Sequence, residues 1–254
     1  MIPMTFKILG PEEAKKRAKA NVAEWMRQKE IEEKKAKTEK QRSLNDALLW
    51  TIDGYNGYAE KKMAEYRADN PNWHKDDNFR MDDIMGLIHG PMIKKVEKLL
   101  TDGADPNARN KQGFTSVMEA AENGDPELIR ILAKSKADVT AQGKNGETAL
   151  MRASFYANDK AVRALIDNGA DLEARDKNGQ TALMHASIQT YPTCCNSWHS
   201  FLGSNRIQTI SNLLEAGANP NARDNDGKTA LTLAKETHEN PEIMAELEKH
   251  GATE

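Results

Sequence analysis

The densest group of reactive side chains is the run TYPTCCNSWHSFLGS at residues 190–204. Its Cys194, Cys195 and His199 are residue types that bind zinc or exchange disulfides, and Trp198 adds an aromatic contact surface. A zinc site needs further ligands, and its cysteines are usually separated by a short spacer. Adjacent cysteines do not meet that spacing. The run therefore favours a loop that contacts a partner or packs on itself, with metal binding and a redox-active thiol pair as alternatives.

Catalytic motifs do not appear in the sequence. It has no Gly-x-Ser-x-Gly elbow, no Gly-rich phosphate loop and no His-Glu-x-x-His motif. The six histidines are scattered and form no recognised motif with a nucleophile. We therefore predict that the protein is not an enzyme, and that it has no catalytic residue, no metal site and no cofactor.

The elements that would position any site have a polar and balanced composition. The 254 residues include 36 Lys and Arg against 39 Asp and Glu, a net charge of -3, which argues against a dedicated nucleic-acid binder. The mean hydropathy of -0.76 favours an elongated architecture with little deep interior. The sequence contains no apolar run of about 18 residues and no convincing signal peptide, so we expect no membrane partner. With no disulfide framework available, we expect a cytoplasmic location, or delivery into the cytosol of a host.

A repeat begins near residue 103. Gly-x-Thr recurs with steps of 33, 33 and 48 residues, and the last step is the same unit lengthened by an insertion of 15 residues. A second pattern follows the same phase, as GADPNAR, KADVTAQ, GADLEAR and GANPNAR. A period of this length indicates stacked helix pairs that bury one continuous apolar layer. Thr at the start of each unit is a helix cap, and Gly103, Gly169 and Gly217 suit helix ends that need a left-handed backbone.

The repeated blocks GFTSVMEAA, GETALMRAS, GQTALMHAS and GKTALTLAK resemble the ankyrin repeat, whose pattern is Gly-x-Thr-Pro-Leu-His. The resemblance covers about residues 82–254. It implies an all-α fold: an ankyrin-repeat solenoid of helix-turn-helix repeats with β-hairpin fingers, preceded by a helical N-terminal extension. The family proline and histidine are replaced throughout, which weakens the usual Thr–His hydrogen-bond pattern. The replacements are Ser116, Ala149, Ala182 and Ala230 for proline, and Met118, Met151, Met184 and Thr232 for histidine.

These patterns predict three domains. They are a charged helical or partly disordered arm at 1–42, a helical capping segment and linker at 43–81, and a repeat domain at 82–254. Within the repeat domain we expect a partial first repeat at 82–106, repeats near 107–139, 140–172 and 173–220, and a closing repeat at 221–254. The third full repeat carries the insertion, at 190–204.

The N-terminal arm is rich in helix-forming and charged residues, with 11 basic and 7 acidic side chains in residues 11–42. Its apolar stripe is thin, so it is either a basic arm that meets an acidic partner or nucleic acid, or a solvated helix or disordered tail. Beyond Ser43, a predicted N-cap, Leu44, Leu48 and Ile52 recur on one helical face. We interpret this second segment as a cap for the repeats.

The resemblance also implies a binding surface, because the family binds proteins in a concave groove formed by hairpin tips and first helices. Carried over by position, the groove sites are Lys111, Gln112, Phe114, Glu122, Asn123, Lys144, Asn145, Glu147, Phe155, Tyr156, Lys177, Asn178, Gln180, Ile188, Gln189, Asn225, Asp226 and Lys228, to which we add Trp198 from the insertion. Since interface anchors are enriched in aromatic residues, we expect Phe114, Phe155, Tyr156 and Ile188 to form the apolar centre of a binding patch. The alternative is that Phe155 and Tyr156 pack against the insertion or simply cover the stack.

Together, these features predict a non-catalytic protein-binding module that recognises a protein partner through the groove, as an inhibitor, adaptor or scaffold. One alternative is a microbial or viral effector, immunity or anti-defence protein that sequesters one target. Another is a nucleic-acid-associated protein that uses the basic N-terminal helix. We expect a monomer, or a dimer formed through the N-terminal helices.

Overall fold

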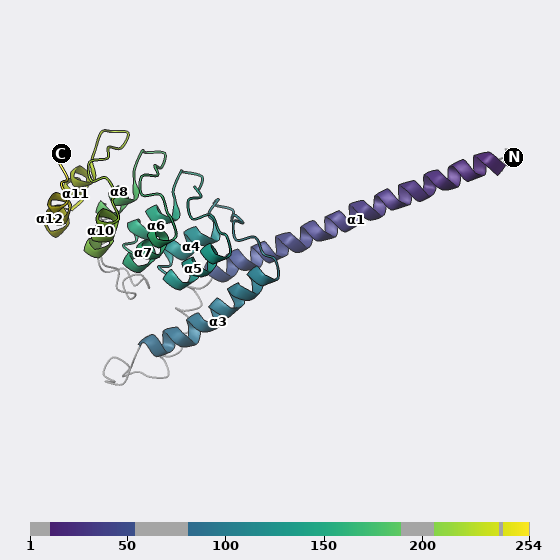
Figure 1. The fold of residues 1–254 in the computed structure, drawn as a ribbon, viewed down its shortest axis with the longest axis horizontal. Coiled ribbons are helices and arrows are strands. Elements are labelled where there is room, and N and C mark those ends of the chain that lie inside the picture. Colours follow the sequence, from purple (N-terminus) through teal and green to yellow (C-terminus); the bar gives the residue numbers. More distant parts are fainter. Residues whose placement is uncertain (1–10, 54–80, 189–205, 239–240, 254) are drawn as a thin grey trace, which may run out of the picture. The chain divides into compact units, whose positions relative to one another are not determined.

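A computed structural model describes residues 11–53, 81–188, 206–238 and 241–253. The chain divides into two compact units, residues 1–43 and 44–254. The helices are α1 (Pro11–Asp53), α3 (Met81–Thr101), α4 (Ser116–Glu122), α5 (Pro126–Lys134), α6 (Ala149–Phe155), α7 (Asp159–Asp167), α8 (Ala182–Ser187), α10 (Arg206–Glu215), α11 (Ala230–His238) and α12 (Pro241–Lys249) (Figure 1). Within the described ranges, no helix is long and apolar enough to cross a membrane.

Helix α1 is solvated from residue 23 to residue 43. All the side chains from 23 to 43 are exposed, and short-range charge pairs such as Lys34 Nζ to Glu30 Oε1, at 2.7 Å, support it. Our prediction that Ser43 caps a separate helix is wrong, because α1 runs without a break from Pro11 to Asp53. The sequence has no glycine or proline between these ends that would interrupt it. The predicted continuation of this helix beyond Asp53 lies outside the described residues.

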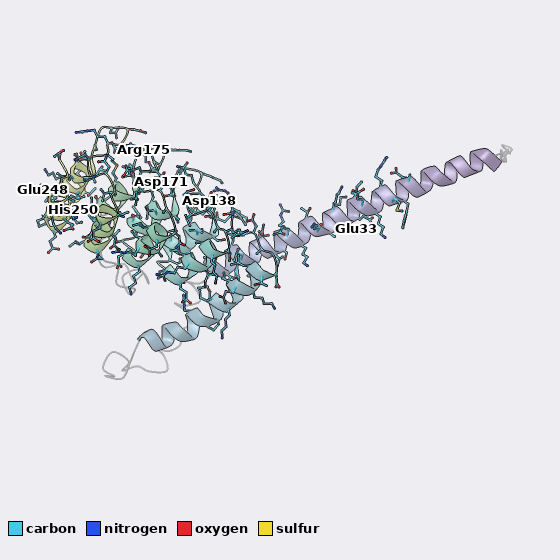
Figure 2. All side chains as sticks on the ribbon, in the orientation of Figure 1. Glu33, Asp138, Asp171, Arg175, Glu248 and His250 are labelled. Carbon is cyan, nitrogen blue, oxygen red and sulfur yellow. The ribbon has the colours of Figure 1, made fainter. Side chains whose placement is uncertain are left out.

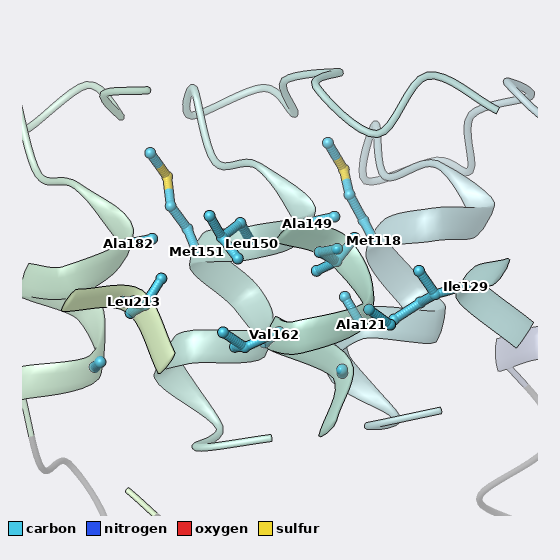
Figure 3. Close-up of a cluster of buried hydrophobic side chains, with 14 of the residues drawn as sticks. Met118, Ala121, Ile129, Ala149, Leu150, Met151, Val162, Ala182 and Leu213 are labelled. Atoms are coloured by element: carbon cyan, nitrogen blue, oxygen red, sulfur yellow. The ribbon is translucent and has the colours of Figure 1, made fainter. Parts of the chain in front are cut away.

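The second unit is built from two rows of helices. Helices α4, α6, α8 and α11 pack side by side as first helices of the repeats, and α5, α7, α10 and α12 pack as second helices (Figure 1). Small residues such as Ala121 and Ala149 let the rows approach closely. Larger side chains such as Leu150, Val162 and Leu213 fill the space between the rows (Figure 3). The buried cluster is continuous through the stack, so each repeat is stabilised by its neighbours.

The last turns of α1, which belong to the second unit, close one end of this stack. Leu48 and Ile52 are both 0% exposed and lie in the same buried cluster as Val96 of α3. Asn123 at the end of α4 donates from Nδ2 to the Ile52 carbonyl oxygen at 3.0 Å. Asn45 Oδ1 accepts from the Asp105 N–H at 2.8 Å. Residues 44–53 therefore cover the first end of the repeats, although they come from far upstream in the sequence.

The fingers between repeats are held by turn chemistry and by contacts with the next finger. In the part of the chain that the structure describes, their hairpin pairing is limited to isolated bridges, Arg109 with Thr115 and Gln142 with Thr148. Asp138 and Asp171 each accept a hydrogen bond through Oδ1 from the N–H two residues later, at 2.9 Å (Figure 2). Turn formation therefore explains these repeated acidic positions.

The methionines that replace the family histidine take part in the helix caps. The Thr115 N–H lies 3.5 Å from Met118 Sδ, while the Met118 N–H donates to Thr115 Oγ1 at 3.4 Å. Thr148 and Met151 repeat both contacts, at 3.4 and 3.3 Å. Met118 and Met151 lie at matching places in α4 and α6 (Figure 3). Because a thioether is a weak acceptor, these caps keep the geometry of the motif with a weaker bond.

The left-handed turns at the ends of the second helices are confirmed. Gly103, Gly169 and Gly217 have φ values of 100°, 84° and 98°. Lys136 takes the same place in its repeat with φ 67°, a region that costs a residue with a Cβ about 1–2 kcal/mol. One repeat therefore carries a backbone penalty that the others avoid.

Replacing Lys136 with glycine is expected to stabilise the protein by about 0.5–1 kcal/mol, because relief of the left-handed strain exceeds the added flexibility of the unfolded chain. Urea unfolding followed by circular dichroism measures this difference. Gly103→Ala is the matched control: an added Cβ would meet no atom within 4 Å, so its expected loss of stability reports the backbone alone. A lower unfolding midpoint for Lys136→Gly would contradict this account.

Candidate functional site

Three consecutive first helices place a titratable side chain at the same position, one repeat apart. These residues are Glu119 in α4, Arg152 in α6 and His185 in α8. Glu119 Oε1 accepts from Asn110 Nδ2 at 2.7 Å, and His185 Nε2 lies 3.1 Å from Asp176 Oδ2. Each side chain is thus tied to the finger of its own repeat. We call the exposed surface of the first helices and fingers the groove face.

Arg152 is the centre of this row. Its guanidinium forms ion pairs with Glu122 and with Glu147, the latter at 3.3 Å, and lies 3.9 Å from the ring centroid of Phe114. Burial lowers the pKa of Arg152, and the negative charge of Glu119 opposes that shift. The ion pairs and the cation–π contact hold the side chain in one place against two neighbouring repeats.

A hollow of about 210 Å³ opens beside Arg152, and we call it the groove hollow. Its walls are Glu147, Met151, Arg152, Phe155, Tyr156 and His185. The rings of Phe155 and Tyr156 meet edge to face, with centroids 5.2 Å apart and an interplanar angle of 88°. Phe155 also faces His185, at 6.3 Å between centroids. The arrangement offers an aromatic recess for an apolar side chain, with charged groups at its rim.

The structure gathers five of the sequence-predicted site residues around Arg152: Phe114, Glu122, Glu147, Phe155 and Tyr156. Phe114 is half-buried against the core and presents only part of its ring. Ile188, which does not line the hollow, is also half-buried and packs against the core. Gln189 and Trp198 lie outside the described residues.

The remaining predicted residues lie on the fingers, except for Asn123. Gln180 and Lys228 of the fingers are half-buried. The other predicted finger residues are exposed: Lys111, Gln112, Lys144, Asn145, Lys177, Asn178, Asn225 and Asp226. Neighbouring fingers are bonded to each other. Lys144 Nζ donates to the Lys111 carbonyl oxygen at 2.7 Å, and Asn225 Nδ2 donates to that of Lys177 at 2.9 Å.

Asn123 is a correction to the predicted groove surface. It is only 5% exposed, and its side-chain amide is bonded to the end of α1. A buried amide that is already satisfied has little surface for a partner, so Asn123 is left out of the binding surface proposed below.

Sequence reasoning missed Arg152 and His185. The sequence contains a signal for both residues. The blocks GFTSVMEAA, GETALMRAS and GQTALMHAS each carry a titratable residue at the same position of the repeat. A charge that recurs in register through neighbouring repeats indicates a row of side chains along one face of the stack.

The described residues hold no group of three or more His, Cys, Asp or Glu side chains arranged to bind a metal ion. The candidate ligands Cys194, Cys195 and His199 lie outside the described ranges, so the sequence-based expectation about the insertion stays a prediction.

Comparison with known families identifies the repeats. A model described as ankyrin repeats in three copies matches residues 87–176 and 117–197, and a model of the single ankyrin repeat matches residues 178–225. Together the matches span residues 87–225, more than half of the chain. A comparison with curated proteins found no match. The predicted all-α repeat fold is therefore confirmed, and the matched repeats are of a kind that forms protein-interaction modules.

Proposed function

Since this chain belongs to the ankyrin repeat family, we propose that it is a non-catalytic module that binds one protein partner on its groove face. The observation that supports this proposal best is the groove hollow, where Phe155 and Tyr156 form an aromatic recess beside a fixed arginine. Interface anchors are enriched in aromatic residues and arginine, and they cluster in well-packed pockets.

The mechanism we propose is occlusion or scaffolding by a preformed surface. The charges at the hollow are already paired within the protein, as Arg152 is with Glu122 and Glu147. The fingers are bonded from one repeat to the next. A partner would therefore meet a surface that loses little conformational freedom on binding, which favours affinity. An inhibitor, an adaptor and a scaffold all fit this mechanism, as does a microbial or viral effector that sequesters one target.

Replacing Phe155 and Tyr156 together with alanine is expected to weaken partner binding by more than about 1 kcal/mol, roughly a fivefold rise in Kd. The immobilised full-length protein first captures the partner from a lysate of the source cell, and mass spectrometry identifies it. Isothermal titration calorimetry then compares the wild-type and variant proteins.

Two controls accompany this measurement. Glu248→Ala changes an exposed residue of α12 and should leave Kd unchanged (Figure 2). Phe155→Leu keeps an apolar side chain in the hollow and separates loss of an anchor from loss of stability, which thermal unfolding checks. Equal affinity for the double variant and the wild type would overturn the proposed site.

The second candidate function is association with nucleic acid or another acidic partner through α1. The observation that favours it is the exposure of every side chain from 23 to 43 in a segment with a basic excess. Deleting residues 1–43 while keeping 44–53 would test it, because phosphate contacts release counterions and make binding strongly salt-dependent. Binding that survives this deletion and varies little with salt would exclude this candidate.

A further inference from the structure

A second hollow lies in the row of second helices and shares no residue with the groove hollow. Its volume is about 410 Å³, and its walls come from α5, α7 and α10. We call it the second-helix hollow. A recess of this size on three successive repeats offers a surface separate from the groove face.

Three of the side chains that line the second-helix hollow are cations: Arg130 of α5, and Lys160 and Arg163 of α7. Asp159 is the one carboxylate among the lining residues. The side chains of Arg130 and Lys160 are exposed. Within the described part of the chain, neither side chain forms a hydrogen bond or an ion pair. The lining therefore has an excess of positive charge, and no carboxylate within the described residues forms an ion pair with Arg130 or Lys160.

The third cation is held in place from within the stack. Asn212 of α10 is only 4% exposed, and its Oδ1 accepts from Arg163 Nη2 at 2.7 Å. The Asn212 side chain is fixed in turn by Gln208 Nε2, at 3.1 Å, and by its own donation to the Asp159 carbonyl oxygen, at 3.1 Å. Arg163 also lies 3.7 Å from Glu215, a pair in which both side chains are about half exposed. An exposed pair of this kind is weak, and a carboxylate from a partner can compete with it.

We propose that the second-helix hollow is a binding site for an acidic segment of a protein partner, whose carboxylates contact Arg130, Lys160 and Arg163. Charge complementarity supports this occupant, because guanidinium groups bind carboxylates in well-defined geometry. A nucleic-acid strand fits less well: a phosphate backbone needs a basic track, whereas here the cations are confined to one recess of a protein with a net charge of -3.

Fluorescence anisotropy with a fluorescein-labelled oligoglutamate peptide tests the proposal on the full-length protein at low ionic strength. The wild type should bind the peptide, and added salt should weaken the complex. The double variant Arg130→Glu with Lys160→Glu should raise Kd at least about tenfold, because it replaces attraction by repulsion at two of the three contacts. Both residues are exposed, so thermal unfolding should confirm that the variant remains folded.

The matched control is Lys94→Glu with Lys98→Glu, which makes the same change in net charge at two exposed positions of α3. Loss of peptide binding in this control as large as in the hollow variant would show a bulk-charge effect and overturn the proposal. Failure of the wild type to bind would do the same. Equal or tighter binding of an oligothymidylate that Arg130→Glu with Lys160→Glu abolishes would assign the hollow to phosphate and reject the acidic peptide. The double variant Phe155→Ala with Tyr156→Ala should bind the peptide as tightly as the wild type does, since the two hollows are separate.

Discussion

Replacing Arg206 with methionine is expected to lower the free energy of unfolding by about 2–4 kcal/mol. The Arg206 guanidinium donates through Nη1 to the carbonyl oxygens of Ala186, at 2.7 Å, and Ile188, at 3.1 Å. Through Nη2 it donates to the Phe155 carbonyl oxygen, at 3.1 Å. The variant would leave three oxygens at helix ends without their donor.

The position of Arg206 explains why so large an effect follows from one side chain. Phe155 ends α6, and Ala186 and Ile188 lie at the end of α8, so the cation faces the negative ends of two first helices. Burial lowers the pKa of Arg206, and the described structure gives it no carboxylate partner. Main-chain oxygens therefore supply the compensation that an acidic residue usually gives to a buried cation.

Urea unfolding and hydrogen exchange together measure the loss at Arg206. In a stack of repeats the loss should concentrate near the affected interface, so we expect faster exchange in α8 and α10 than in α4. Arg206→Lys should recover part of the stability, because an ammonium keeps the charge but not the planar fork of donors. Arg130→Met, an exposed arginine of α5, is the control and should change stability by less than about 0.5 kcal/mol. A loss below about 1 kcal/mol for Arg206→Met would show that water replaces the guanidinium.

The elements that the sequence predicts best are those that each repeat determines locally. Thr115 and Thr148 cap their helices, and Gly103 has the expected left-handed backbone, because each of these features depends on residues a few positions away. The 33-residue step then gives equivalent residues of neighbouring repeats the same position, as it does for Glu119, Arg152 and His185.

The features that escaped prediction depend on contacts between distant segments. Asn123 looks like a variable groove residue in its own repeat. It is buried by the end of α1, where its side chain bonds to Ile52, a residue 71 positions upstream. Arg206 follows an insertion, and its acceptors are main-chain oxygens, which no side-chain pattern reveals. The sulfur contacts in the helix caps are local, but a comparison with the family motif records only the loss of the histidine and not the weaker acceptor in its place.

Replacing Leu48 with alanine is expected to lower the free energy of unfolding by about 2–5 kcal/mol, and Ile52→Ala by a similar amount. Both side chains are 0% exposed and belong to the cluster that contains Val96. Each substitution leaves a cavity at the first end of the stack, where no further repeat can close over it. Thermal and urea unfolding measure the effect, which is a large fraction of the roughly 5–15 kcal/mol that stabilises a typical domain.

Two comparisons make the role of residues 44–53 testable as a cap. Trp50→Ala removes a larger side chain that is 68% exposed and whose ring centroid lies 5.1 Å from Lys95 Nζ, so it should cost less than about 1 kcal/mol. Deleting residues 1–43 should change stability little, since its described side chains are exposed, whereas deleting residues 1–53 should also remove the partner of Asn123 and leave part of the core open to water. If both deletions unfold at the same urea concentration, residues 44–53 do not stabilise the repeats. If only the longer deletion is destabilised, residues 44–53 cover the apolar surface that the partial first repeat would otherwise expose to water. Any truncated protein used to study binding must then begin before Leu44.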